Sequence, residues 1–596
     1  MSEQSRGDEL VAIGDGADES RPGLAPQAVE PAPPVGESSA DLAPAMTRFA
    51  IVLLALVAVA ATTIRGQDLA IVLLWRQDVA VSAMIVLLLL MLAARPAWFA
   101  RVPAARLYPP RPVLMAMFVL LATAGGAWLV FGNFDLSRDE FLANFDATAF
   151  AHRHAFAPIS AEWKPYADAM MPLFMRQLTD HFGWISGYLP GNAMLRSLAD
   201  LTVGRSWTSP ILAAVSVLTL AAIARRLWPE ARDHAAVPVL LLVVSPQFLT
   251  MAMTPWAMTA HLTFNLLWLR CYLQDSRRGD AGALACGFVA TGLHQIVFHP
   301  LFAAPFILEL LFQRRFARAA TFIAGYAAIG LFWMLYPALF LPLAHAQTTG
   351  GLTGMANAIG ELLHTFSGAN VFMMLLNLIR FAAWQNPLLI VLAALAWPII
   401  RSGDPIARPL FVGVIAILFI CYLLMPWQGN GWGYRYLHGY IGSLCLLAGY
   451  GWTRVRDQMA ARRVLIITSV ATILLILPFQ LATTATMVRP YRVASAMIAK
   501  SGADVVLVDT SYYRFGSDVI RNDADPRRLP KAMDLQLLSE DDLKTLCNRY
   551  DVRLFDQRHA LAAGIAAATT KDLSGHRAIL PAIGCDHPLP LPLPSR

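Results

Sequence analysis

Repeated apolar runs about 20 residues long constrain this chain more than any other feature, because a helix of that length spans the hydrocarbon core of a bilayer. Of its 596 residues, 57% are hydrophobic and only 15% are charged, and the mean hydropathy is +0.52. Such a composition excludes an ordinary soluble globular protein. The sequence therefore predicts a polytopic α-helical membrane protein.

About thirteen runs qualify as candidate transmembrane helices, some of them short. They are residues 47–64, 79–94, 113–131, 209–228, 236–254, 256–273, 281–298, 300–312, 319–341, 386–400, 409–425, 437–453 and 464–484.

Arginine placement predicts the orientation, since short cytoplasmic loops of membrane proteins collect Lys and Arg. Every second loop is basic, at 95–111, 225–232, 277–278, 314–318, 401–408 and 454–463. We therefore expect a protein of the cytoplasmic membrane, surrounded by membrane lipids, with a cytoplasmic N-terminus and a periplasmic or extracellular C-terminus. The net charge of +7 then reflects topology, and no nucleic-acid partner is expected.

The regions flanking the predicted transmembrane domain, residues 46–486, differ in composition. Residues 1–45 hold nine acidic residues, two arginines and six prolines, which predicts a disordered cytoplasmic tail. Residues 487–596 predict a small external α/β domain with a proline-rich tail, because helix-like stretches run into strand-like ones. If this domain lies in an oxidising compartment, Cys547 and Cys585 are expected to form a disulfide.

Residues 132–208 are too many for a simple connection between helices, which is typical of a functional loop. Near its start lies the acidic pair Asp139 and Glu140, just outside an apolar run. Apolar residues at helical spacing over 141–154 and 170–178 predict amphipathic helices at the membrane surface. We therefore predict an external catalytic loop.

Further candidate substrate-binding residues lie in two stretches of the loop. EWKPY supplies Glu162 and Lys164, and WISGYLPG supplies Trp184 and Tyr188. The alternative for the two aromatic residues is a role as interfacial anchors. Asn192, directly after this stretch, is expected to cap a helix whose first amides favour an anion.

Two other loops predicted on the same side contribute Arg435, Tyr436, His294 and His299. An arginine at the outer end of a span runs against the charge rule, and a guanidinium that holds a phosphate would explain Arg435. The alternative is a buried pair with a loop carboxylate, including Asp139 or Glu140. The two histidines are candidate substrate-binding residues, or they simply satisfy backbone carbonyls near a helix end.

Taken together, these motifs resemble the GT-C superfamily of membrane glycosyltransferases. The pattern is an apolar helix, an external loop with an Asp-Glu pair, surface helices, WISGYLPG, many further spans and a late Arg-Tyr pair. It resembles the branch with the protein O-mannosyltransferases and the aminoarabinose transferases of lipid A, over roughly residues 113–484 and by topology more than identity. The resemblance implies sugar transfer from a polyprenyl-phosphate donor to a lipid, glycan or protein acceptor outside the cytoplasmic membrane.

By position, the resemblance implies that Asp139 is the general base and that Glu140 orients it or contacts the acceptor. Arg435 and Tyr436 would hold the donor phosphate. A positioned carboxylate contributes about 10² to 10⁴ in rate, and a fixed positive charge stabilises a departing phosphate. Asp146 follows two helical turns after Asp139 and is either a second carboxylate or part of a solvated face.

The sequence departs from the familiar GT-C pattern in two ways. The acidic loop follows the third predicted span instead of the first, and no W-W-D-x-G motif is present. The missing motif argues against an oligosaccharyltransferase catalytic subunit and against an obligatory metal. We expect no cofactor, although a carboxylate cluster is able to hold Mg²⁺ or Mn²⁺.

Two other classes of function remain as alternatives. A transporter or flippase of a lipid-linked saccharide would place ionisable residues at the bilayer midplane within repeats, whereas the acidic groups gather in predicted external loops. A membrane O-acyltransferase would use a buried histidine such as His294.

Overall fold

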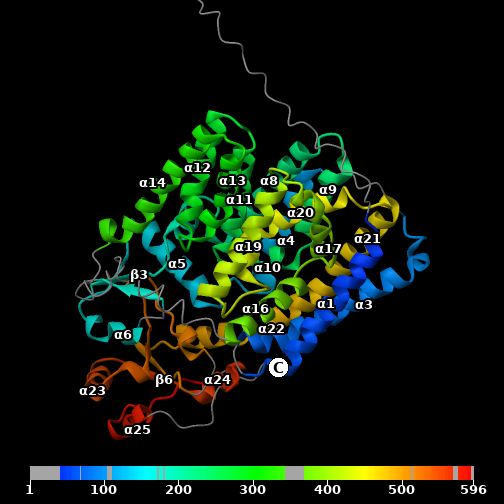
Figure 1. Ribbon diagram of the computed structural model, residues 1–596. Helices are drawn as coiled ribbons and strands as arrows, with labels where there is room; N and C mark the ends of the chain where they lie inside the picture. Colours follow the sequence, from blue (N-terminus) through cyan, green and yellow to red (C-terminus); the bar gives the residue numbers. More distant parts are fainter. Residues whose placement is uncertain are drawn as a thin grey trace, which may run out of the picture. The chain divides into compact units, whose positions relative to one another are not determined.

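The computed structural model describes residues 40–66, 69–103, 111–170, 174–178, 182–341, 368–511, 515–567 and 575–591 (Figure 1). The described residues belong to one compact unit that starts at Ser39. Most of the tail predicted for residues 1–45 lies outside them, and helix α1 already begins at Leu42.

The described part of the chain is mainly helical. Its α-helices are α1 (Leu42–Thr63), α2 (Leu69–Leu73), α3 (Val79–Ala94), α4 (Pro112–Leu129), α5 (Arg138–Ala151), α6 (Ala167–Met170), α7 (Gly191–Asp200), α8 (Thr208–Leu227), α9 (Arg232–Val243), α10 (Pro246–Met251), α11 (Met258–Tyr272), α12 (Arg277–Thr291), α13 (Phe298–Phe312), α14 (Phe316–Phe340), α16 (Gly368–Ala383), α17 (Leu388–Leu395), α18 (Trp397–Arg401), α19 (Ala407–Leu424), α20 (Ile441–Trp452), α21 (Gln458–Ala471), α22 (Leu477–Ala499), α23 (Glu540–Arg549), α24 (Gln557–Ala563) and α25 (Gly575–Ala582).

Within the described ranges, seven helical segments are long and apolar enough to cross a membrane. They are 42–63, 69–94, 112–129, 205–227, 316–340, 407–424 and 458–499, and a bent pair, 370–383 with 388–401, makes eight if it counts as one span. These segments fit a multi-pass membrane protein. Each of the thirteen predicted runs falls on a helix, but α11, α12 and α13 have only 15 residues each. By length and composition the structure therefore supports seven or eight spans, fewer than the thirteen predicted.

The bent pair includes a helix that the sequence analysis did not predict, α16, because polar residues interrupt its apolar run. Arg380 of α16 is fully buried, and its Nε donates to Asp78 Oδ2 at 3.0 Å. Asp78 ends a π-helical segment (Leu74–Asp78) between α2 and α3, and it also accepts from Trp384 Nε1 at 2.8 Å. This ion pair connects the N-terminal helices to the central part of the chain.

The loop between α4 and α8 contains a small antiparallel sheet as well as helices. Its strands are β1 (Ala157–Pro158), β2 (Met175–Gln177) and β3 (Gly183–Ser186), in the order β1-β3-β2. The helix predicted over 170–178 is therefore wrong at residues 175–177, which form strand β2 and pair with β3. Leu173 of that prediction lies outside the described residues.

The C-terminal region has a second, fully parallel sheet in the order β5-β4-β6, formed by β4 (Val505–Val508), β5 (Lys531–Asp534) and β6 (Val552–Phe555). α23 precedes β6, as the helix-to-strand pattern predicts. The predicted domain boundary at residue 487 falls inside α22, which continues to Ala499. Cys547 and Cys585 form a disulfide with a Cα–Cα distance of 5.8 Å.

The loop and the C-terminal sheet share one hydrophobic core. Phe145 of α5 and Trp163 of the loop belong to the same buried cluster as Val505 and Leu507 of β4. In Figure 1 the loop elements β3 and α6 accordingly lie beside the orange and red C-terminal elements. The helix that carries Asp139 is therefore packed against the described residues that follow α22, which we call the C-terminal unit.

Candidate active site

Asp139 lies in the first turn of α5, which begins with a capping box. Ser137 Oγ accepts a hydrogen bond from the Glu140 amide at 3.3 Å, and Glu140 Oε2 accepts one from the Ser137 amide at 2.7 Å. Such a reciprocal pair satisfies two amides that a helix start leaves free. The capping box therefore determines where α5 starts and where Asp139 lies.

Arg435 begins a 3-10 turn (Arg435–Tyr440) that follows a glycine-rich loop. Its amide donates to Gln428 Oε1 at 2.9 Å, while Gln428 Nε2 donates to the Gly433 carbonyl at 2.8 Å. Gly433 has a φ of +68° and packs directly on the Gln247 side chain, so a larger residue would strain this loop. These contacts hold the loop that presents Arg435.

Asp139 and Arg435, far apart in sequence, form a buried ion pair with Tyr188 beside it. Arg435 Nη1 donates to Asp139 Oδ2 at 2.6 Å, and each of these side chains is only 9% exposed. The Tyr188 hydroxyl donates to Asp139 Oδ1, also at 2.6 Å. The Arg435 guanidinium lies over the Trp256 ring, 4.2 Å from its centroid. The pairing of Arg435 with a loop carboxylate, considered as an alternative from the sequence, is thus present in the structure.

This environment keeps Asp139 ionised. Burial alone would raise the pKa of its carboxyl, but the charge of Arg435, with the hydrogen bonds from Tyr188 and Arg435, outweighs burial and lowers that pKa below its usual value. Asp139 is therefore a carboxylate at neutral pH.

Tyr188 is positioned by backbone pairing between its own loop and the segment after α12. The Leu189 amide donates to the His294 carbonyl at 3.0 Å, and the Gly191 amide donates to the Gly292 carbonyl at 2.7 Å. A Cβ on Gly191 would lie 2.6 Å from the Gly292 oxygen, so the close approach requires glycine. As a result the His294 ring stacks on Tyr188 with centroids 3.9 Å apart.

Asn192 does not cap α7. The residue before the helix is Pro190, and the Asn192 side chain instead donates to the Pro255 carbonyl at 3.0 Å. The amides of Gly191 and Asn192, the first two of α7, bond to the Gly292 and Leu293 carbonyls, so these two are not free to hold an anion.

Glu140 and Asp146 lie near Asp139 in sequence but bond to other partners. Glu140 is 1% exposed and caps α5, with Oε1 lacking a hydrogen-bond partner among the described residues. Burial raises its pKa to about 8. Asp146 accepts from the Ser186 amide at 3.1 Å, and burial raises its pKa to about 7. Near neutral pH both are largely or partly protonated, unlike Asp139.

The remaining predicted site residues divide between the site and its surroundings. Tyr436 joins the site, because Arg435 Nη2 donates to its hydroxyl at 3.2 Å. His299 is fully buried. Its Nδ1 lies 2.7 Å from Asn265 Oδ1, and its Nε2 lies 2.7 Å from the Tyr326 hydroxyl. Trp184 packs against Phe145 in the loop core. Glu162 is exposed and Lys164 half-buried, and neither is among the hydrogen-bond partners of Asp139 in the described part of the chain.

Several polar residues around this site were not among the predicted site residues. Arg380 donates through Nη2 to the Gly431 carbonyl at 2.7 Å, so a second guanidinium reaches the loop that carries Arg435. His261 and His438 are buried, and their ring nitrogens have no hydrogen-bond partner among the described residues. Ionisable residues inside apolar runs are uncommon in membrane proteins, and that rarity was the signal available in the sequence.

No group of three or more His, Cys, Asp or Glu side chains in the described part of the chain is arranged to hold a metal ion. The oxygens of Asp139 face Arg435 and Tyr188, a setting that fits a cation poorly.

No protein-family model and no curated protein matches the sequence. Among solved structures, the chain is similar to two of ArnT from Cupriavidus metallidurans, one in the apo state and one bound to undecaprenyl phosphate. Both alignments have 15% sequence identity and cover 70% of this chain and 89% of that chain, with TM-scores of 0.44 and 0.46. Similarity at this level does not carry the activity of ArnT over to this chain.

Proposed function

We propose that this protein is a membrane glycosyltransferase of the GT-C type. It would transfer a sugar from a polyprenyl-phosphate donor to a lipid, glycan or protein acceptor on the outer face of the cytoplasmic membrane. The observation that carries the proposal is the buried Asp139–Arg435 pair with Tyr188, which joins an ionised carboxylate to a fixed positive charge. The donor class follows from the sequence resemblance.

In this proposal Asp139 accepts the proton that the acceptor hydroxyl or amine loses as it attacks the anomeric carbon. The bond from that carbon to the donor phosphate breaks, and the phosphate leaves with the electron pair. Asp139 is suited to the task because it is ionised and held in place by two hydrogen bonds.

Arg435 would hold the donor phosphate and stabilise the charge that develops on it. Its Nε is buried and has no hydrogen-bond partner among the described residues, so a phosphate oxygen placed beside it would satisfy this donor. When the phosphate shares the guanidinium, Asp139 loses part of the charge that lowers its pKa. The carboxylate then becomes a stronger base at the moment when the donor is in place.

The test is sugar transfer in membranes supplied with labelled polyprenyl-phosphate sugars. We expect Asp139→Asn, expressed at the same level as the native chain, to lose about 10² to 10⁴ in rate, since the base is gone while the shape is kept. The matched control is Asp541→Asn, an exposed carboxylate on α23, with native activity expected. Equal transfer by the native chain and Asp139→Asn would refute the role of Asp139.

The same assay separates the two alternative classes. An O-acyltransferase should tolerate Asp139→Asn and lose its activity with His294→Asn, the reverse of what we expect. A transporter would show no transfer with any donor of a broad panel, in either the native chain or the variants.

A further inference from the structure

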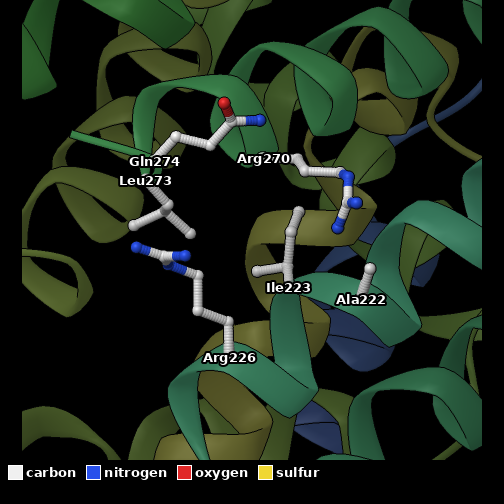
Figure 2. Close-up of a pocket in the computed structure, with 6 residues that line it drawn as sticks. All are labelled: Ala222, Ile223, Arg226, Arg270, Leu273 and Gln274. Atoms are coloured by element: carbon white, nitrogen blue, oxygen red, sulfur yellow. The ribbon is translucent and has the colours of Figure 1, made fainter. Parts of the chain in front are cut away.

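A cavity lies between α8 and α11, away from the Asp139 site. Arg226 comes from α8 and Arg270 from α11, and Figure 2 shows their guanidinium groups on opposite sides of Ile223, with Gln274 beside Leu273. Its volume is about 150 Å³, and Ala222, Ile223 and Leu273 give it an apolar side. We define these six residues as the Arg226–Arg270 pocket.

The pocket is at the end of α8 remote from Asp139. Ser209, at the start of α8, accepts a hydrogen bond from Arg196 of the loop helix α7 at 3.4 Å. Arg226 is in the last turn of this 20-residue helix, which is about 30 Å long. The two sites are therefore separated by about the thickness of a bilayer core, and the arginine pattern predicts that the pocket faces the cytoplasm.

The two helices run in the same direction and are joined by polar contacts. Ser216 Oγ of α8 lies 2.9 Å from Thr263 Oγ1 of α11, which also bonds to the Leu212 carbonyl at 2.9 Å. Both helices end at the pocket, and each C-terminus carries about half a negative charge. The two guanidinium groups carry two positive charges, and the two helix ends together carry about one negative charge. About one positive charge is left over, so the pocket still favours an anion.

The guanidinium groups of Arg226 and Arg270 have no hydrogen bond or ion pair within the residues that the structure describes. By contrast, Arg318 at the same end binds Asp275 and Asp280. Asp275, which also binds Arg315, acts on Arg226 only through its charge. Two unpaired guanidinium groups that line one cavity make it electropositive, and a phosphate is an anion that a guanidinium binds well.

Apolar residues on the face of α8 next to the pocket indicate that the phosphate belongs to a lipid. Leu218, Ala222 and Arg226 are spaced four residues apart, so they lie on one face of the helix. Leu218 is 40% exposed, and Ile211 near the other end of α8 is 37% exposed. An acyl chain is able to follow this apolar stripe while its headgroup occupies the pocket.

We propose that the Arg226–Arg270 pocket binds the phosphate of an anionic phospholipid at the cytoplasmic surface of the membrane. Basic pockets at the cytoplasmic ends of membrane-protein helices are a known setting for such headgroups, and α8 is one of the helices long enough to span the membrane. The proposal does not depend on the glycosyltransferase activity.

The test uses the full-length purified chain, with lipid binding counted by native mass spectrometry and stabilisation followed by thermal unfolding. The probes are phosphatidylglycerol, phosphatidylcholine and inorganic phosphate. We expect phosphatidylglycerol to bind at least about tenfold more tightly than phosphatidylcholine. The double variant Arg226→Gln with Arg270→Gln should bind phosphatidylglycerol roughly 25-fold more weakly, because each arginine contributes about fivefold to the affinity.

The matched control is Arg225→Gln, since Arg225 neighbours Arg226 on the exposed end of α8 but does not line the pocket. It should retain affinity within about twofold of the native chain. Equal binding of both lipids, or an equal loss in the control, would overturn the proposal. If inorganic phosphate binds as tightly as phosphatidylglycerol and only the double variant loses it, the ligand is soluble phosphate and the lipid assignment is wrong.

Discussion

Asp139 and Glu140 are adjacent carboxylates whose environments push their pKa values in opposite directions. Burial tends to raise both values, but only Asp139 has a partner of sufficient opposite charge, Arg435. The stability that Asp139 contributes is therefore present above its ordinary pKa and lost as the pH falls through its lowered value. Glu140 behaves in the opposite way, because its burial in the folded protein favours the neutral, protonated carboxyl.

We expect Glu140→Gln to stabilise the protein more at high pH than at low pH. The stability that Glu140 contributes is fully present below about pH 4.5 and is lost as the pH rises through about 8. Gln keeps the capping box and carries no charge. Thermal unfolding at pH 5 and pH 9 should show the larger increase in Tm at pH 9, equivalent to a few kcal/mol at most.

The control for this prediction is the exposed Glu162→Gln, which should leave the Tm close to native at both pH values. If Glu140→Gln raised the Tm by the same amount at pH 5 and at pH 9, this would contradict the assignment of a raised pKa to the Glu140 carboxyl.

At the scale of elements, α5 is held at its N-terminus by the C-terminal unit. Arg138, next to Asp139 in the chain, pairs with Asp518 at 2.6 Å and also bonds to Ser517. Arg521 donates to the Leu136 carbonyl at 2.9 Å and lies over Phe134, 4.3 Å from the ring centroid. The C-terminal unit is therefore in a position to align the turn that carries Asp139.

We predict that Asp518→Asn lowers kcat for sugar transfer about tenfold and leaves the KM for the donor unchanged. Loss of the ion pair loosens the first turn of α5, and a small misplacement of a catalytic group is costly, whereas the Arg435 loop is untouched. Steady-state kinetics on the variant and on Asp523→Asn measure the effect. Asp523 pairs with the exposed Arg528 in the same unit, so this control should stay native. A rise in KM with unchanged kcat would place Asp518 in donor binding instead.

At the scale of the whole molecule, the Asp78–Arg380 pair joins segments about 300 residues apart. Both side chains are fully buried, so removing one partner leaves an uncompensated charge. The pair connects the N-terminal helices to α16, whose Arg380 also reaches the Arg435 loop. The N-terminal helices are thereby part of the support of the candidate active site.

We expect Asp78→Asn or Arg380→Gln alone to destabilise the protein by about 3–5 kcal/mol, and the double variant to recover much of that loss. Unfolding of the purified chain in detergent measures the three variants. The exposed Arg528→Gln is the control and should cost less than about 1 kcal/mol. Additive losses in the double variant would show that the two residues act independently.

The sequence by itself determined the features that depend on neighbouring residues. Apolar runs placed the helices, the Ser137–Glu140 spacing is a capping box that starts α5, and helix-to-strand patterns located β4 and β6. These signals act over one or two turns, so they are readable locally. The number of membrane spans and strand β2 were less predictable, because helix length and strand pairing depend on distant partners.

Only the tertiary structure decided which charged groups meet. Sequence reasoning selected Asp139, Tyr188 and Arg435, but their contacts join three separate segments, and nothing local indicates that Asp139 faces Arg435. The Asp78–Arg380 pair and the Arg226–Arg270 pocket likewise exist only because distant helices pack together. Charge pairing and burial depend on separations in space, and those are set by packing of the whole chain.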